Sequence, residues 1–138
     1  MNCYVIGPGG SGQTYFMNFL NKNNIKTNNI KDLDGLKHKP KPINSFKYIF
    51  IYNDPLKCIL SHYRRRHVVY QVYKLGNPHK LKLKIVKYFY LLQNTTIDMN
   101  CDIFGVKNQF DNFINYEGDI LFIDFNEILD NKKKLIHF

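Results

Sequence analysis

Four of the eight glycines in the chain fall within six positions near its start. Glycines allow successive backbone N–H groups to face one anion, and the N-terminus of a following helix adds its positive end. We therefore interpret this segment as a phosphate-binding turn. The residues expected to contact the anion are Gly9, Gly10, Ser11, Gly12, Gln13 and Thr14.

Residues 7–14 have the frame G-x-x-x-x-G-x-T, which is close to the nucleotide-binding frame G-x-x-x-x-G-K-[ST]. Gln13 stands where that frame has lysine, so the cation that contacts the β- and γ-phosphates of ATP is missing. The sequence therefore disfavours an ordinary ATPase or GTPase. The alternative is a glycine-rich turn between a strand and a helix that binds nothing.

The turn is expected to lie between a strand over 3–6 and an amphipathic helix. The apolar face of that helix would comprise Tyr15, Phe16, Phe19 and Leu20. A weak second strand is predicted over 25–30 and a loop over 31–42, which contains one glycine and two prolines. Residues 46–52 are β-branched and aromatic, which is typical of a strand buried on both faces.

Asp54 and Pro55 follow that strand and suit the N-cap and the first turn of a helix. Its inward face would comprise Leu56, Ile59, Leu60 and Tyr63. Later in the chain the pattern predicts a helix over 81–92, although the alternation over 80–85 also fits a strand. A short helix with Phe110, Phe113 and Ile114 inward and a strand over 120–125 follow. Asn126 is the expected cap of a last helix.

Strands that alternate with helices predict a single three-layer α/β domain over residues 1–138, with a small, mainly parallel sheet flanked by helices. We expect about four or five strands. The strands at 3–6 and 46–52 should be neighbours, because the loops that follow them must reach one ligand. Their carboxyl ends should form the cleft, as in open α/β sheets generally.

The net charge of +9 favours anionic partners, and the 44% hydrophobic content excludes a wholly disordered chain. Cys3, Cys58 and Cys101 are too widely spaced for a zinc site, so no metal is expected. No apolar run is long enough for a membrane span or a signal peptide, and we expect a soluble protein of the cytoplasm. The abundance of Asn, Lys and Ile is typical of an AT-rich genome, such as that of a large DNA virus.

Taken in order, the motifs resemble those of the sulfotransferase superfamily. Its first loop, G-P-x-[KR]-S-G-T-T, holds the 5′-phosphosulfate end of the donor 3′-phosphoadenosine 5′-phosphosulfate, and its second motif, R-[ND]-P with a later Ser, holds the 3′-phosphate. Matching residues are Gly7, Pro8, Ser11, Gly12 and Thr14 in the first motif, and Asp54, Pro55 and Ser61 in the second. Residues 37–40 and 121–128 are similar to two further segments of the family.

The resemblance implies a short, divergent family member with a P-loop-type fold. It would transfer a sulfuryl group from 3′-phosphoadenosine 5′-phosphosulfate to an unidentified hydroxyl acceptor, with His38 as the catalytic base and no metal. Gly10 and Asn53 stand in this chain where the two family motifs have basic residues, and both are still expected to contact the donor. Arg65 lies one helical turn after Ser61, so it is expected to take over the 3′-phosphate contact.

Two other functions fit the same sequence. The first is a binding module that retains a nucleotide or anion site, for example for 3′-phosphoadenosine 5′-phosphate, without turnover. The second is a basic nucleic-acid-binding protein. Its contacts would come from Arg64–Arg66, Lys80, Lys82, Lys84 and Lys87, with Tyr70, Tyr73 and Tyr88 stacking on bases. In all three interpretations His62, His67 and His79 are expected at the surface.

Overall fold

A computed structural model of the chain describes residues 3–43, 46–68, 71, 102 and 104–130. The strands are β1 (Tyr4–Ile6), β2 (Tyr48–Tyr52) and β3 (Ile120–Asp124). The helices are α1 (Gln13–Lys22), α2 (Pro55–Arg64), α5 (Val106–Ile114) and α6 (Phe125–Asp130). The helix predicted over 81–92 lies outside the described residues, and the described elements form a small α/β domain.

The strands form a parallel sheet in the order β1-β2-β3. Val5 pairs with Ile49, and Ile49 pairs with Leu121 on the other side. The predicted proximity of the first strand and the strand near residue 50 is therefore confirmed. The described residues contribute three strands to the sheet, fewer than the four or five expected.

The strand predicted over 25–30 was wrong, because a side chain takes its place. Thr27 makes a single bridge to Cys3. Next to it, Asn28 Oδ1 accepts a hydrogen bond from Val5 N at 2.8 Å, and Asn28 Nδ2 donates to Val5 O at 3.1 Å. One amide group thus satisfies the outer backbone groups of β1, which a paired strand would otherwise satisfy.

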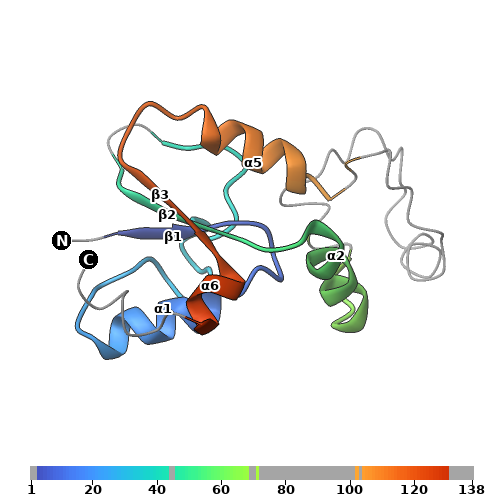
Figure 1. Cartoon of the computed structure of the whole chain (residues 1–138), viewed down its shortest axis with the longest axis horizontal. Helices are drawn as coiled ribbons and strands as arrows, with labels where there is room; N and C mark the ends of the chain where they lie inside the picture. The colour runs from blue at the N-terminus through green and yellow to red at the C-terminus, as the bar shows by residue number, and fades with distance from the viewer. Residues whose placement is uncertain (1–2, 44–45, 69–70, 72–101, 103, 131–138) are drawn as a thin grey trace.

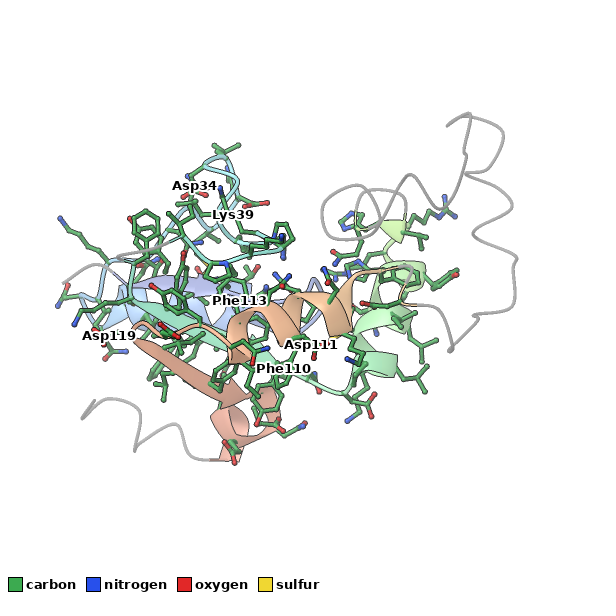
Figure 2. All side chains as sticks on the ribbon, turned by 90° about the horizontal axis from the view of Figure 1, so that it is seen from above. Asp34, Lys39, Phe110, Asp111, Phe113 and Asp119 are labelled. Atoms are coloured by element: carbon green, nitrogen blue, oxygen red, sulfur yellow. The ribbon has the colours of Figure 1, made fainter. Side chains whose placement is uncertain are left out.

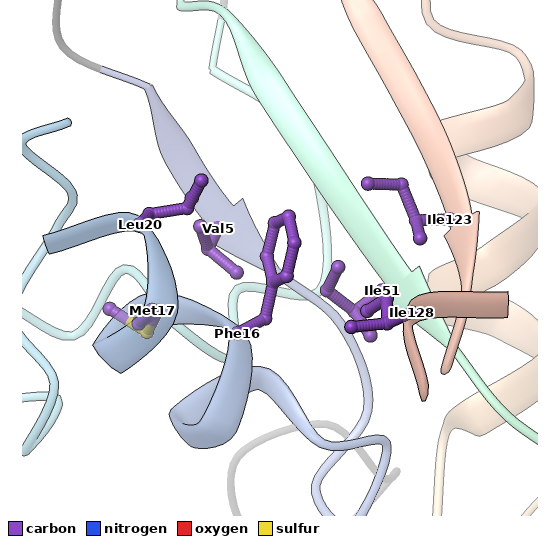
Figure 3. Packing of buried hydrophobic residues seen from close by; sticks show 7 residues of the cluster. All are labelled: Val5, Phe16, Met17, Leu20, Ile51, Ile123 and Ile128. Atoms are coloured by element: carbon purple, nitrogen blue, oxygen red, sulfur yellow. The ribbon is translucent and has the colours of Figure 1, made fainter. Parts of the chain in front are cut away.

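Helices cover both faces of the sheet, α5 on one and α1 with α6 on the other (Figure 1). Because side chains alternate along a strand, each strand feeds both cores. On the α1 side, the buried cluster comprises Val5, Phe16, Met17, Leu20, Ile51, Ile123 and Ile128 (Figure 3). On the other face, Phe113 of α5 (Figure 2) belongs to a second buried cluster with Ile6, Tyr48 and Phe50.

Several predicted helix faces are rotated in the structure. Tyr15 is 41% exposed, and Met17 is buried in its place. Leu56 and Leu60 are 43% and 50% exposed, because α2 turns Cys58 and His62 inward together with Ile59, which was expected there. Ile114 of α5 was also expected inside and is exposed. In each case apolar spacing located the helix, and the packing of its neighbours selected the buried face.

The start of α2 is as predicted, and the start of α6 is not. Asp54 Oδ1 accepts hydrogen bonds from Leu56 N at 2.8 Å and Lys57 N at 3.2 Å, with Pro55 in the first turn. Asn126 was expected to cap the last helix but lies inside it. Asp124 Oδ1 accepts from Asn126 N at 2.8 Å, so the carboxylate that ends β3 is the cap.

Candidate functional site

The glycine loop, residues Gly7–Gly12, connects β1 to α1 at the carboxyl end of the sheet, where α2 also lies (Figure 1). Gly12 is the N-cap of α1, with φ of 93° and no side-chain capping hydrogen bond. Gly10 lies against α2 so closely that a Cβ there would be 3.1 Å from Ser61 Cβ. The loop and α2 therefore form one compact unit at the end of the sheet.

A cavity of about 390 Å³ opens at this unit. Its walls are the glycine loop, the first turn of α1, the loop residues Lys37 and His38, the end of α2, and the side chains of Gln71 and Phe125. No described residue that lines it is an acid. Basic side chains and the positive N-terminal end of α1 thus line the same cavity, and its described lining residues include no carboxylate. This combination favours an anionic ligand.

Gln13 closes the glycine loop with its side chain. The side chain is almost completely buried, and its Nε2 donates a hydrogen bond to Gly7 O. Its amide therefore holds together the two ends of the turn, although it also lines the cavity. Gln13, which stands where nucleotide-binding frames have lysine, therefore stabilises the conformation of the loop.

Lys37 brings a cation to the start of α1. Its side chain is 6% exposed, and its Nζ donates to Thr14 Oγ1 at 2.5 Å and to Ile30 O at 2.9 Å. Burial lowers the pKa of the ammonium group, and the nearby Arg65 guanidinium lowers it further. We did not single out Lys37 from the sequence, because its contact with Thr14 spans 23 residues and no local spacing indicates it.

His38 lies beside the glycine loop, as the resemblance implied. Its Nδ1 is 3.0 Å from Gly7 O, and because a carbonyl only accepts, the ring donates from Nδ1 and keeps its lone pair on Nε2. Burial, aided by the charges of Lys37 and Arg65, lowers the pKa of His38 to about 4. The imidazole is therefore neutral near pH 7 and able to accept a proton.

The structure brings Ser61 and Arg65 to the same cavity. Arg65 is the C-cap of α2, and its Nε donates to Ser61 O at 3.1 Å. Arg65 is an exposed residue, and the Nε hydrogen bond uses one of the five N–H donors of its guanidinium group. The helical spacing that placed these two residues together is confirmed.

Two predicted contact residues do not line the cavity. Asn53 Oδ1 accepts a hydrogen bond from Asp54 N at 2.8 Å, within its own turn. Ser11 is completely buried inside the glycine loop. The predicted residues that do line the cavity are Gly9, Gly10, Gly12, Gln13, Thr14, His38, Ser61 and Arg65.

The expectation that His62 is a surface residue was wrong. Its side chain is 3% exposed, and its Nε2 donates to Gly9 O at 2.7 Å. Burial, aided by Arg65, His38 and His67, lowers the pKa of His62 to about 4. The apolar pattern of α2 could not indicate this, because it suggested that a different face of the helix was buried.

Comparisons of the chain with protein-family models, with curated proteins and with solved structures gave no match. Among the residues that the structure describes, no group of histidine, cysteine and acidic side chains is arranged to hold a metal ion. No helix in the same residues is long and apolar enough to cross a membrane.

Proposed function

We propose that the chain binds a nucleotide with two separated anionic groups, of the kind represented by 3′-phosphoadenosine 5′-phosphate. The 5′-phosphate would lie on the glycine loop and the start of α1, and the 3′-phosphate beside Ser61 and Arg65. The observation that carries this proposal is a cavity lined by Lys37, Arg65 and an uncapped helix N-terminus, with no acid among its described lining residues.

The loop offers two kinds of donor to an anion. The backbone N–H groups of Gln13 and Thr14 belong to the first turn of α1 and have no intrahelical acceptor. Lys37 uses two of its three ammonium donors on Thr14 and Ile30, which leaves one for a ligand. Lys37 thus supplies the positive charge that the missing loop lysine would otherwise supply.

The cavity suits a phosphorylated ligand in size and chemistry. Its volume of about 390 Å³ lies in the range of small-molecule sites. Guanidinium, ammonium and backbone N–H groups are the donors that phosphate and sulfate prefer. The same donors would also bind the phosphosulfate of 3′-phosphoadenosine 5′-phosphosulfate. That molecule would supply an activated sulfuryl group.

Calorimetric titration of the full chain tests the proposal. We expect 3′-phosphoadenosine 5′-phosphate to bind more tightly than ATP or single-stranded DNA. Lys37→Met should weaken that binding about 10–100-fold, because a charge-assisted hydrogen bond is lost. Lys39→Met is the matched control, because Lys39 lies in the same loop outside the cavity lining. Equal losses for the two variants would contradict a specific site, and a preference for DNA would favour the nucleic-acid alternative.

His38 supports a second candidate, sulfuryl transfer. In this reaction the acceptor oxygen forms a bond to sulfur while the bond from sulfur to the phosphate oxygen breaks. The acceptor proton passes to His38 Nε2, and 3′-phosphoadenosine 5′-phosphate leaves. The supporting observation is a neutral imidazole, held by Gly7 O, at the edge of the proposed anion site.

Transfer of radiolabelled sulfate from the donor to a panel of phenols, sugars and tyrosyl peptides tests this candidate. His38→Ala should lower the rate about 10²–10⁴-fold and leave nucleotide binding intact. His67→Ala is the matched control, since His67 is an exposed histidine of the same cavity. Binding without transfer by the wild type would restrict the function to the binding module.

A further inference from the structure

Two buried polar atoms of the cavity have no hydrogen-bond partner among the described residues. They are His62 Nδ1 and Gln71 Nε2. The side chains of His62 and Gln71 are 3% and 2% exposed, and both line the cavity. A buried polar atom without a hydrogen-bond partner lowers the stability of the folded protein, so each of these two atoms requires a physical explanation.

These two side chains flank the same glycine. A Cβ on Gly9 would lie 2.6 Å from Gln71 Oε1 and 2.8 Å from His62 Nε2. Gly9 therefore lets a histidine and a glutamine, nine positions apart in sequence, meet over the start of the glycine loop. The hydrogen bond from His62 Nε2 to Gly9 O fixes the imidazole ring, and the hydrogen bond from Gln71 N to His67 O at 3.0 Å fixes the backbone of Gln71.

The two atoms have opposite hydrogen-bonding character. Because His62 Nε2 donates to a carbonyl, the lone pair of the neutral ring is on Nδ1, which is an acceptor. Gln71 Nε2 is a donor. A hydroxyl group complements both atoms, because it donates one hydrogen bond and accepts others. A phosphate oxygen would satisfy the glutamine and leave the histidine acceptor unpaired.

We propose that His62 and Gln71 recognise a ribose hydroxyl of the ligand, the 2′-hydroxyl beside the 3′-phosphate. The inference rests on the proposed function, in which Ser61 and Arg65 contact that phosphate. His62 follows Ser61 in α2, and both line the cavity, so His62 belongs to the wall where the 3′-phosphate and the neighbouring 2′-hydroxyl would bind. The cavity therefore selects a ribonucleotide over a deoxyribonucleotide.

A pair of ligands that differ by this one hydroxyl tests the inference. The full chain is titrated with 3′-phosphoadenosine 5′-phosphate and with 2′-deoxyadenosine 3′,5′-bisphosphate. The wild type should bind the ribose form about 10-fold or more tightly, because the deoxy form leaves two buried groups unpaired. His62→Phe and Gln71→Leu should bring the ratio of the two affinities close to one. The affinity for the deoxy ligand should remain close to that of the wild type.

The ratio separates recognition from a structural role, since a variant that only loosens the fold weakens both ligands together. Gln71→Glu replaces the donor by an acceptor and should also lose the preference. Equal binding of the two ligands by the wild type would overturn the inference and leave the proposed nucleotide site standing. Binding of neither ligand would overturn both.

Discussion

At the scale of single residues, the charge of the site comes from a part of the chain distant from the glycine loop. Gln13 occupies the position of the lysine in nucleotide-binding frames, but its amide closes the loop and the cation comes from Lys37. A local frame can indicate an anion site. It cannot say which distant residue supplies the positive charge.

Arg65 and Arg66, which directly follow the last residue of α2, allow a controlled test of the 3′-phosphate contact. Arg65 lines the cavity, whereas its neighbour Arg66 does not. Arg65→Gln should weaken 3′-phosphoadenosine 5′-phosphate about 10–100-fold and leave adenosine 5′-phosphate almost unaffected. Titration of both nucleotides measures this difference. If Arg66→Gln has the same effect, or if both nucleotides weaken together, the arginines form a general basic surface.

The sequence predicted some of these contacts and missed others for a physical reason. The i, i+4 spacing that joins Ser61 to Arg65 is a property of any helix and is therefore visible in the sequence. The contact between His62 and Gly9 spans 53 residues and depends on how α2 packs against the loop. Such contacts exist only once the fold has formed.

At the scale of elements, the loop between β1 and α1 is held in place by α6. Gly12 has a positive φ of 93°, and a Cβ on it would collide with the ring of Phe125, the first residue of α6. The end of the sheet thus contributes to the shape of the proposed anion site. This contact also explains why this position must be glycine, whether or not a ligand binds.

The effects of Gly12→Ala and Gly35→Ala on stability distinguish the cost of backbone strain from the cost of a steric collision with Phe125. Gly35 has φ of 66° and open space around its Cβ position, so alanine there should cost only the strain of about 1–2 kcal/mol. Gly12→Ala should cost about 1–3 kcal/mol more, because the core is overpacked as well. Urea unfolding measures both. The excess should disappear when Phe125→Ala is added, and equal costs at the two glycines would contradict the collision.

The order of the elements was predictable because their periodicities are strong. Residues 48–52 form a continuous apolar and aromatic strand, and Asp54 and Pro55 mark the start of the next helix in a conventional way. The rotated face of α2 was not predictable, because Leu60 is exposed while His62 is buried. The glycine loop and Phe104 pack on the polar side of that helix.

At the scale of the whole molecule, two buried histidines make stability depend on pH. In the folded protein the pKa values of His38 and His62 are lowered to about 4, below their ordinary value of 6.5. The unfolded chain therefore binds more protons between these limits. The stability contributed by neutral histidines is complete above about pH 6.5 and is lost as the pH falls toward 4.

Urea unfolding between pH 4.5 and 7.5 tests this dependence. Each histidine should add about 1.4 kcal/mol per pH unit to the slope where it is protonated only in the unfolded chain. His38→Gln and His62→Gln should each flatten the curve. His67→Gln, an exposed neighbour, is the control. A wild-type curve that stays level over this range would contradict the burial of both rings.

The amide of Asn28 has a consequence for how molecules of this protein meet. An outer strand with unpaired backbone groups is a template on which another chain can add its own strand, and such additions lead to aggregates. Asn28 occupies both the N–H and the carbonyl of Val5, and Cys3 is bridged to Thr27 beside it. This border of the sheet is therefore closed to the addition of a strand from another molecule.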